Sequence, residues 1–189
     1  MADLYVKSLD MINPFVVASS PATQGAKNVL KSAKMRPGAI VMRNFGHGSG
    51  GGSYFGPDAS AAYSGQACYH SHAVGRQIQD KVSTLEQYCE EVRRARQALD
   101  SDIKLWVSIG HYSDIVKGGD WEKNWVNQAK ELKLAGADAF ELHFNTPGVA
   151  VAKDRTFDYY GLVRHCTGMI KAAAGDTKVM VKLAIESCD

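Results

Sequence analysis

Five short apolar runs, each rich in β-branched residues, alternate along the chain with segments of helical periodicity. The runs are PFVVAS (14–19), AIVMRN (39–44), IKLWVSIG (103–110), AFELHFN (139–145) and KVMVKLA (178–184). Runs this short and this apolar are typical of strands that are buried on both faces, as the strands of parallel sheets are. Their alternation with helical segments predicts a parallel sheet whose strands are joined by crossover helices.

Four stretches between the runs have the apolar period of an α-helix. They lie at about 25–35, after Ser83, from Trp121 to Leu132, and from Tyr159 to Ala173. Ser83 with Glu86 predicts a capping box at the start of the second helix. Glycines 38, 136 and 175 each lie between a helix and the next strand, where a helix C-terminus favours glycine.

The segments that follow the strands are long, whereas the links from helix to strand are short. Segments 45–82, 111–119 and 146–157 would all lie at the carboxyl ends of the strands, which is the pattern of a (β/α)8 TIM-barrel with its active site on that side. A Rossmann-like open sheet is the alternative. Five glycines within seven positions follow the second strand, but no helix follows them closely, so an active-site loop is favoured over a phosphate cradle. A plain structural connector is the other interpretation.

Charge and cysteine content exclude several classes of protein. The net charge is only +2 with no basic tail, so nucleic acid is not expected as a partner. No apolar run could span a bilayer, so no membrane partner is expected either. The four cysteines form no CxxC pair, so neither a metal site nor a disulfide framework is predicted, and a cytoplasmic location with reduced thiols fits. The length favours one domain over residues 1–189.

Polar residues interrupt the fourth run at alternate positions. Strand alternation places Glu141, His143 and Asn145 on one face, with Leu142 and Phe144 on the other. Inside a barrel, such a polar set near the carboxyl end indicates a site, although a hydrogen-bonded core histidine fits as well.

Other polar residues stand in or just after the predicted strands. Lys182 in VMVKLA must find a partner, a ligand or solvent, because an unpaired buried ammonium is costly. Arg43 ends the second run in the same way. Ser108 is the only hydroxyl in LWVSIG and is either a site residue or a small core residue. The turn from Asn145 to Gly148, which includes Thr146, either belongs to the site or only ends the fourth strand.

Motifs spread over the whole chain resemble those of a known family. The motifs are NPFVVASSPAT after an opening β-hairpin (LYVKSLDMINPF), GAIVMRN, GADAFELHFNTPG and VMVKLA. In order and spacing the chain resembles the FMN-dependent dihydroorotate and dihydropyrimidine dehydrogenases of pyrimidine metabolism, which are (β/α)8 barrels.

The resemblance implies a flavoprotein oxidoreductase that passes hydride between a small ring or enoate-like substrate and flavin N5. The residues that it assigns to FMN are Ala18, Ser19, Ser20, Arg43, Asn44, Ser108, His143 and Lys182. It assigns proton transfer to Thr146, with His143 as the alternative and Lys182 beside them, and substrate contacts to Asn145 and Arg43. Thr146, His143 and Gly148 depart from the family pattern, which makes dihydroorotate itself a doubtful substrate.

The length predicts an incomplete barrel. A full barrel takes about 250 residues, and the 189 residues account for about five βα units. We therefore expect an inactive portion of a barrel, completed by a C-terminal half-barrel or by homo-oligomerisation. Two other functions stay open: a non-catalytic binding or assembly module derived from a barrel, and a non-flavin (β/α) barrel lyase or isomerase that uses Lys182.

Overall fold

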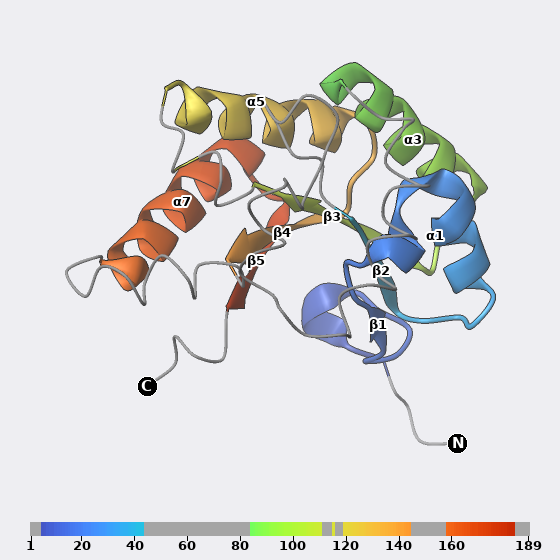
Figure 1. Cartoon of the computed structure of the whole chain (residues 1–189). Helices are drawn as coiled ribbons and strands as arrows, with labels where there is room; N and C mark the ends of the chain where they lie inside the picture. The colour runs from blue at the N-terminus through green and yellow to red at the C-terminus, as the bar shows by residue number, and fades with distance from the viewer. Residues whose placement is uncertain (1–4, 44–83, 111–114, 116–118, 145–157, 184–189) are drawn as a thin grey trace, which may run out of the picture.

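Five parallel strands form one sheet in the order of the sequence. The computed structural model describes residues 5–43, 84–110, 115, 119–144 and 158–183. The strands are β1 (Val16–Val17), β2 (Ala39–Met42), β3 (Lys104–Ile109), β4 (Ala139–Phe144) and β5 (Lys178–Leu183), and each pairs with the next. An open Rossmann-type sheet reverses its strand order at a switch point, and this sheet does not. The predicted fold, an incomplete (β/α) TIM-barrel, is therefore confirmed as a curled half-barrel (Figure 1).

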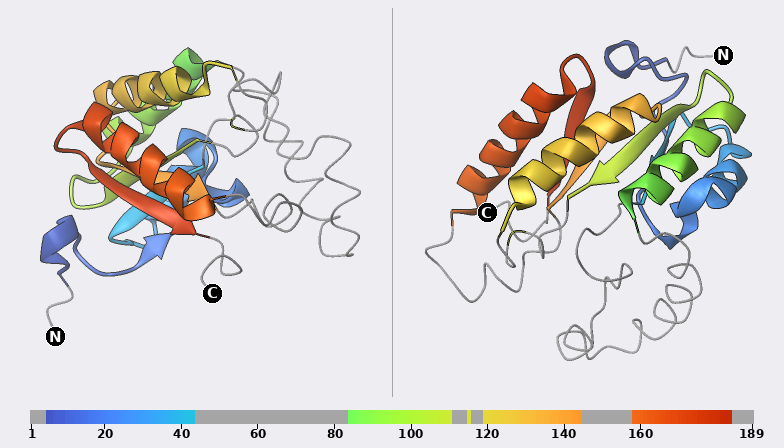
Figure 2. Two further views of the ribbon diagram at one scale, coloured as in Figure 1. Left: turned by 90° about the vertical axis from the view of Figure 1, so that its left-hand side faces the viewer. Right: turned by 90° about the horizontal axis from the view of Figure 1, so that it is seen from above.

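The α-helices of the described residues cover one face of this sheet (Figure 2). They are α1 (Gly25–Ala33), α3 (Leu85–Ala98), α5 (Trp121–Leu134) and α7 (Tyr159–Ala174). All four lie where the apolar period predicts them. The predicted cap of α3 is displaced by one residue: Thr84 is the N-cap and its side chain accepts a hydrogen bond from the Gln87 amide (3.2 Å), whereas Ser83 lies outside the described residues.

The main core lies between the helices and the outer face of the sheet. Alternate residues of the three central strands point into it, and all are at most 1% exposed: Ile40, Met42, Leu105, Val107, Ile109, Phe140, Leu142 and Phe144. Trp125 of α5 is fully buried against them, and its ring packs 6.2 Å from that of Phe144. Gly110 ends β3 at φ +79°, where a Cβ atom would lie 2.6 Å from the Trp125 ring, so only glycine fits.

A smaller apolar cluster occupies the inner face at the amino ends of the strands. It consists of Ala39, Val41, Trp106 and Ala139, and Met11 packs against them. Met11 is held by an antiparallel bridge to Val6, around the short 3-10 helix η1 (Lys7–Leu9). The predicted opening hairpin is thus present as this single bridge. A second 3-10 helix, η2 (Pro21–Thr23), links β1 to α1.

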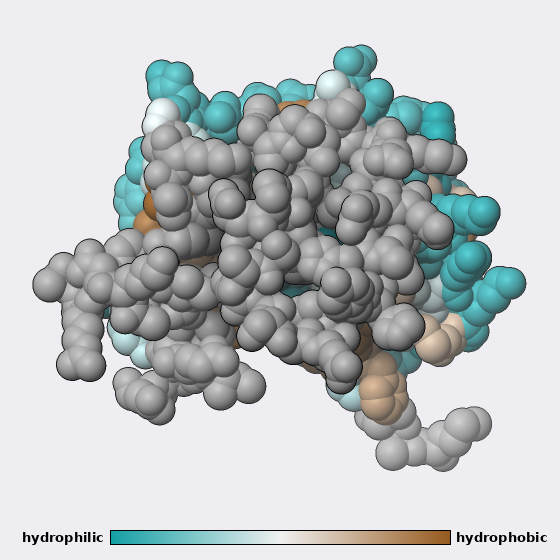
Figure 3. Space-filling model, viewed as in Figure 1, coloured by the Kyte–Doolittle hydropathy of each residue, from teal (hydrophilic) through white to brown (hydrophobic). Residues whose placement is uncertain are grey.

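The molecular surface that Figure 3 leaves visible around the grey atoms is mostly hydrophilic, with smaller hydrophobic patches. None of the helices in the described ranges combines the length and the apolarity needed to cross a bilayer.

Candidate active site at the carboxyl ends of the strands

Polar side chains replace the apolar ones on the inner face towards the carboxyl ends of β3, β4 and β5. Alternation is maintained, so Ser108, Glu141, His143 and Lys182 stand on the face opposite the main core. The sheet register places Ser108 beside Glu141 and His143 beside Lys182. The predicted inward orientation of Glu141 and His143 is therefore confirmed, and two more predicted residues lie next to them.

Glu141 is the acidic group of this arrangement. Burial raises the pKa of its carboxyl group, and the charge of Lys182 and the Ser108 hydroxyl offset only part of that effect. Glu141 was placed on the inner face by alternation, but the sequence analysis gave it no catalytic role. A carboxyl group in an otherwise apolar strand was the signal that could have done so.

Two oxygen atoms at the centre of the site lack a hydrogen-bond partner within the described part of the chain. They are Ser108 Oγ and Glu141 Oε1, and both are inaccessible to solvent. The Ser108 hydroxyl is near enough to favour the charged carboxylate, but the two groups complete no well-aligned hydrogen bond. Buried polar atoms in folded proteins are nearly always paired, so these two atoms mark a place where a polar group from elsewhere would bind.

His143 and Lys182 lie one step nearer the carboxyl ends. His143 is 7% exposed, so it is a buried histidine on the inner face of the sheet. Lys182 is half-buried on β5, and its positive charge acts on Glu141 from the neighbouring strand.

Arg43 follows the last residue of β2 and is anchored at this end of the sheet. Its guanidinium donates a hydrogen bond to Gln24 Oε1 (3.2 Å), and its carbonyl oxygen accepts one from the Tyr88 hydroxyl (2.6 Å). Tyr159 repeats the second contact on β4, where its hydroxyl donates to the carbonyl oxygen of Phe144 (3.0 Å). Both tyrosines lie in helical stretches whose apolar period explains their rings, but that period gives no sign that their hydroxyls bind the ends of β2 and β4.

The segment Ala18–Ser20 forms a tight turn after β1. The Thr23 hydroxyl accepts a hydrogen bond from the Ser20 amide (3.0 Å) and donates to the Ser20 carbonyl oxygen (3.0 Å). The Ala22 amide donates to Ser20 Oγ (3.2 Å). These bonds explain Ser20 and Thr23 without a ligand.

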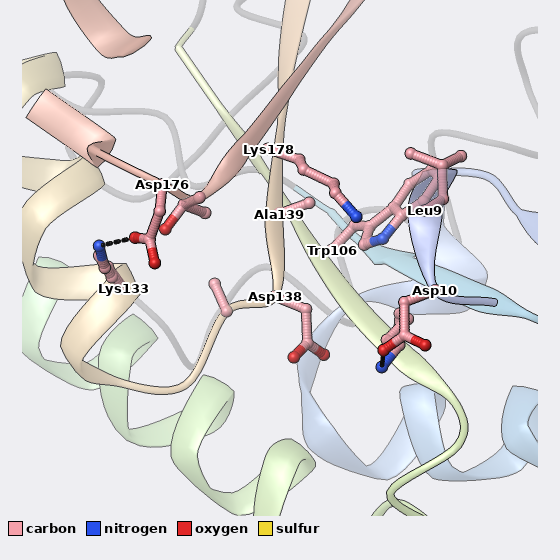
Figure 4. Close-up of a pocket in the computed structure, with 11 residues that line it drawn as sticks. Leu9, Asp10, Trp106, Lys133, Asp138, Ala139, Asp176 and Lys178 are labelled. Atoms are coloured by element: carbon pink, nitrogen blue, oxygen red, sulfur yellow. Dashed lines mark hydrogen bonds and ion pairs between the residues drawn. The ribbon is translucent and has the colours of Figure 1, made fainter. Parts of the chain in front are cut away.

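A cavity of about 360 Å³ lies at the opposite end of the strands (Figure 4). Its charged lining is largely paired: Lys104 with Asp10 (2.6 Å), Lys133 with Asp176 (2.7 Å), and Asp138 with Arg96 (2.8 Å). None of the predicted site residues lines it. In barrels the amino ends of the strands serve stability rather than catalysis. These ion pairs are therefore better explained as structural links from η1 to β3, from α5 to the start of β5 and from α3 to the start of β4.

Three predicted site residues, Asn44, Asn145 and Thr146, lie outside the described residues. The glycine-rich segment 45–57 that was predicted to border the site lies outside them as well. Among the residues that the structure describes, no three His, Cys, Asp or Glu side chains gather as they would around a metal ion.

Comparison with known proteins gives matches among solved structures only. No protein-family model and no curated protein matches the sequence. A phosphoenolpyruvate phosphomutase from Streptomyces platensis subsp. rosaceus matches with 15% identity and a TM-score of 0.45, over 90% of this chain and 55% of that one. A phosphonopyruvate hydrolase matches with 15% identity and a TM-score of 0.43, over 94% and 59%. The same kind of hydrolase in complex with oxalate and Mg²⁺ matches with 17% identity and a TM-score of 0.40, over 85% and 50%.

The chain thus spans between half and three fifths of the length of the structures that it matches. These structures are named as a phosphomutase and hydrolases, not as FMN-dependent dehydrogenases, and this overturns the predicted family. The predictions that followed from this family are therefore wrong as well: the oxidoreductase activity, the flavoprotein character, the FMN cofactor and the place in pyrimidine metabolism. At this low similarity we transfer no activity from these proteins to the chain.

The motifs behind the wrong prediction have structural roles in the described residues. Asn13 of NPF accepts hydrogen bonds from the amides of Phe15 (3.0 Å) and Gly38 (2.8 Å) and donates to the Arg36 carbonyl oxygen (3.0 Å). Asp138 of GADA pairs with Arg96 and accepts a hydrogen bond from the Leu105 amide (2.7 Å). Such contacts hold βα units together whatever the barrel binds, so these motifs do not identify a cofactor.

Proposed function

We propose that the chain forms the active-site half of a non-flavin (β/α) barrel enzyme, of the lyase or isomerase class, that moves a proton on a small anionic substrate. The observation that carries this proposal is the buried Glu141 carboxyl group within the electrostatic reach of Lys182, on the inner face at the carboxyl ends of the strands. That end is where barrel enzymes place their chemistry.

Glu141 and Lys182 would have different roles in a proton transfer. A carboxylate whose pKa is raised by burial is a stronger base than one in water, and general bases work best when their pKa approaches the operating pH. When Glu141 accepts a proton from the substrate, the electron pair of the broken bond stays on the substrate as negative charge. The Lys182 ammonium stabilises that charge most effectively at a site from which water is excluded.

The neighbouring residues complete the proposed site. His143 lies beside Lys182 in the register and is the second candidate for proton transfer. Arg43 at the end of β2 supplies a further positive charge for orienting an anion. Asn145 and Thr146 are retained as candidates because they follow β4 directly in the sequence.

Proton-transfer activity can be sought without knowing the substrate. The chain, at concentrations at which its copies associate, would be incubated in D2O with a panel of small keto, hydroxy and dicarboxylic acids, and conversion or deuterium incorporation would be followed by NMR. We expect at least one acid to react, with a rate that falls about 10²-fold or more in Glu141→Gln and also falls in Lys182→Met.

Lys178→Met is the matched control, because Lys178 stands on the same strand and face but at its amino end. Its rate should equal that of the unmodified chain. Full activity in Glu141→Gln, or a panel in which no acid reacts, would refute the proposal.

We also propose that further strands pair with the two edges of the sheet, supplied by a second copy of the chain or by a completing half-barrel. In the described residues β1 pairs only with β2, and β5 only with β4. Exposed apolar residues lie at both edges, with Phe15 and Val16 at β1 and Leu183 on β5. The buried free thiols of Cys89 and Cys166 fit a reducing compartment such as the cytoplasm.

A further inference from the structure

Ser108 and Glu141 are neighbours that each have a buried oxygen atom able to form a further hydrogen bond. They are register neighbours on β3 and β4, Ser108 is completely buried, and Ser108 Oγ and Glu141 Oε1 have no partner among the described residues. A buried polar atom that stays unpaired destabilises a fold, and a ligand that forms a hydrogen bond with the atom removes that penalty.

The chemistry of the pair selects the group that it would bind. A hydroxyl oxygen donates one hydrogen bond and accepts others at a single atom. It could donate to Glu141 Oε1 and accept from the Ser108 hydroxyl at the same time. A substrate carboxylate would only accept, and its negative charge would face that of Glu141. A carbonyl oxygen would leave the Glu141 carboxylate without a donor.

The charges around the pair locate the rest of the substrate. Lys182 acts on Glu141 from β5, and His143, two residues beyond Glu141 on β4, is the register partner of Lys182. A substrate hydroxyl bound by Ser108 and Glu141 therefore brings an anionic group on a neighbouring carbon towards the Lys182 ammonium.

We infer that the substrate is a hydroxy acid, whose hydroxyl group binds between Ser108 and Glu141 and whose carboxylate is held by Lys182. This inference rests on the proposed function and specifies the substrate class of the same site. It goes further because it predicts selectivity for one functional group.

The test compares pairs of acids that differ by one hydroxyl group. Calorimetric titration would measure the affinity of the chain for malate against succinate and for lactate against propionate. Sites built to bind a substrate hydroxyl discriminate strongly against the analogue that lacks it. We expect the hydroxy acid of at least one pair to bind about tenfold or more tightly. In Ser108→Ala that preference should fall to about threefold or less, with the affinity for the deoxy acid unchanged.

Ser32→Ala is the matched control, because Ser32 is a buried serine on α1, away from the inner face. It should keep the full preference. Equal affinities within both pairs, or a preference that survives in Ser108→Ala, would overturn the inference while leaving the NMR exchange result, and with it the proposed function, intact. Absence of both binding and exchange would overturn the two proposals together.

Discussion

The buried carboxyl group of Glu141 lowers the stability of the fold by an amount that depends on pH. Burial raises the pKa of Glu141 from its ordinary value of 4.5, so the folded chain binds the proton more tightly than the unfolded chain does. Below the pKa that Glu141 has in the unfolded chain, its burial as a carboxylate does not lower the stability. The loss of stability grows as the pH rises from that pKa to the pKa in the folded chain, and it is complete above the folded pKa.

Glu141→Gln should remove this pH dependence. Because glutamine carries no titrating proton, the stability of the variant relative to the unmodified chain should be more favourable at pH 8 than at pH 4. Urea unfolding at the two pH values measures this difference. Glu86→Gln, on the first turn of α3, is the control and should show no comparable change. The same relative stability of Glu141→Gln at both pH values would show that burial does not affect this carboxyl group.

Two glycines on different elements give opposite predictions for the same substitution. A Cβ atom on Gly38 would overlap the backbone carbonyl oxygen of Asn13, so Gly38→Ala should move the backbone there and cost about 1–3 kcal/mol. Gly168 lies exposed on α7 with no atom within 4 Å of a Cβ position, so Gly168→Ala should stabilise the chain by up to about 1 kcal/mol. Chemical denaturation of both variants measures the two changes. Loss of stability in both would contradict the reason given for Gly38.

Among the helices and strands, a repeated contact fixes the carboxyl ends of β2 and β4. Tyr88 and Tyr159 both lie in the first turn of the helix that follows the strand, and both hydroxyls donate to the carbonyl oxygen at its end. The ends that they hold are those that carry Arg43 and the polar residues of β4. We infer that the tyrosines position the candidate site without contacting a substrate.

Removal of one hydroxyl should loosen one strand end and leave the ring packing intact. Tyr88→Phe and Tyr159→Phe should each cost about 1 kcal/mol of stability, the net value of one hydrogen bond. Amide hydrogen exchange should quicken near Arg43 in the first variant and near Phe144 in the second. Each variant is the control for the other, because the two hydroxyls bind the ends of different strands. Equally faster exchange at both strand ends in each variant would contradict a local role.

The elements themselves were predictable because their signals are local. The β-branched runs located all five strands, and alternation placed Glu141 and His143 on one face, as the structure has them. The hydroxyl of Tyr88 was not predictable, because its partner Arg43 lies 45 positions away and a tyrosine in an apolar stripe fits a purely hydrophobic role. The cofactor was predicted wrongly because Asn13 and Asp138 stabilise the barrel and carry no information about its ligand.

The amino and carboxyl ends of the strands differ in how their polar groups are paired. At the amino ends of the strands, charges are neutralised in ion pairs such as Lys104–Asp10 and Lys133–Asp176. At the carboxyl ends, Ser108 and Glu141 keep buried oxygen atoms without partners in the described part of the chain. In the described part of the chain, ion pairs thus mark the amino ends of the strands, and the two unpaired oxygen atoms of the candidate site lie towards the carboxyl ends.

The sheet edges predict association. The β5 strand is paired on one side only in the described residues, and Leu183 on it is 41% exposed. A βα unit added beside β5 would pair with its backbone and cover this side chain, whereas charged residues on edge strands oppose such pairing. Light scattering across a concentration series should therefore give a molar mass above that of one chain. Leu183→Lys should weaken the association about tenfold or more, since burying an unpaired charge at the new contact is costly. Leu134→Lys changes a leucine that is 78% exposed on α5, away from both edges, and should leave the mass unchanged. A single-chain mass at every concentration, or equal effects of the two lysines, would show that β5 does not recruit a partner.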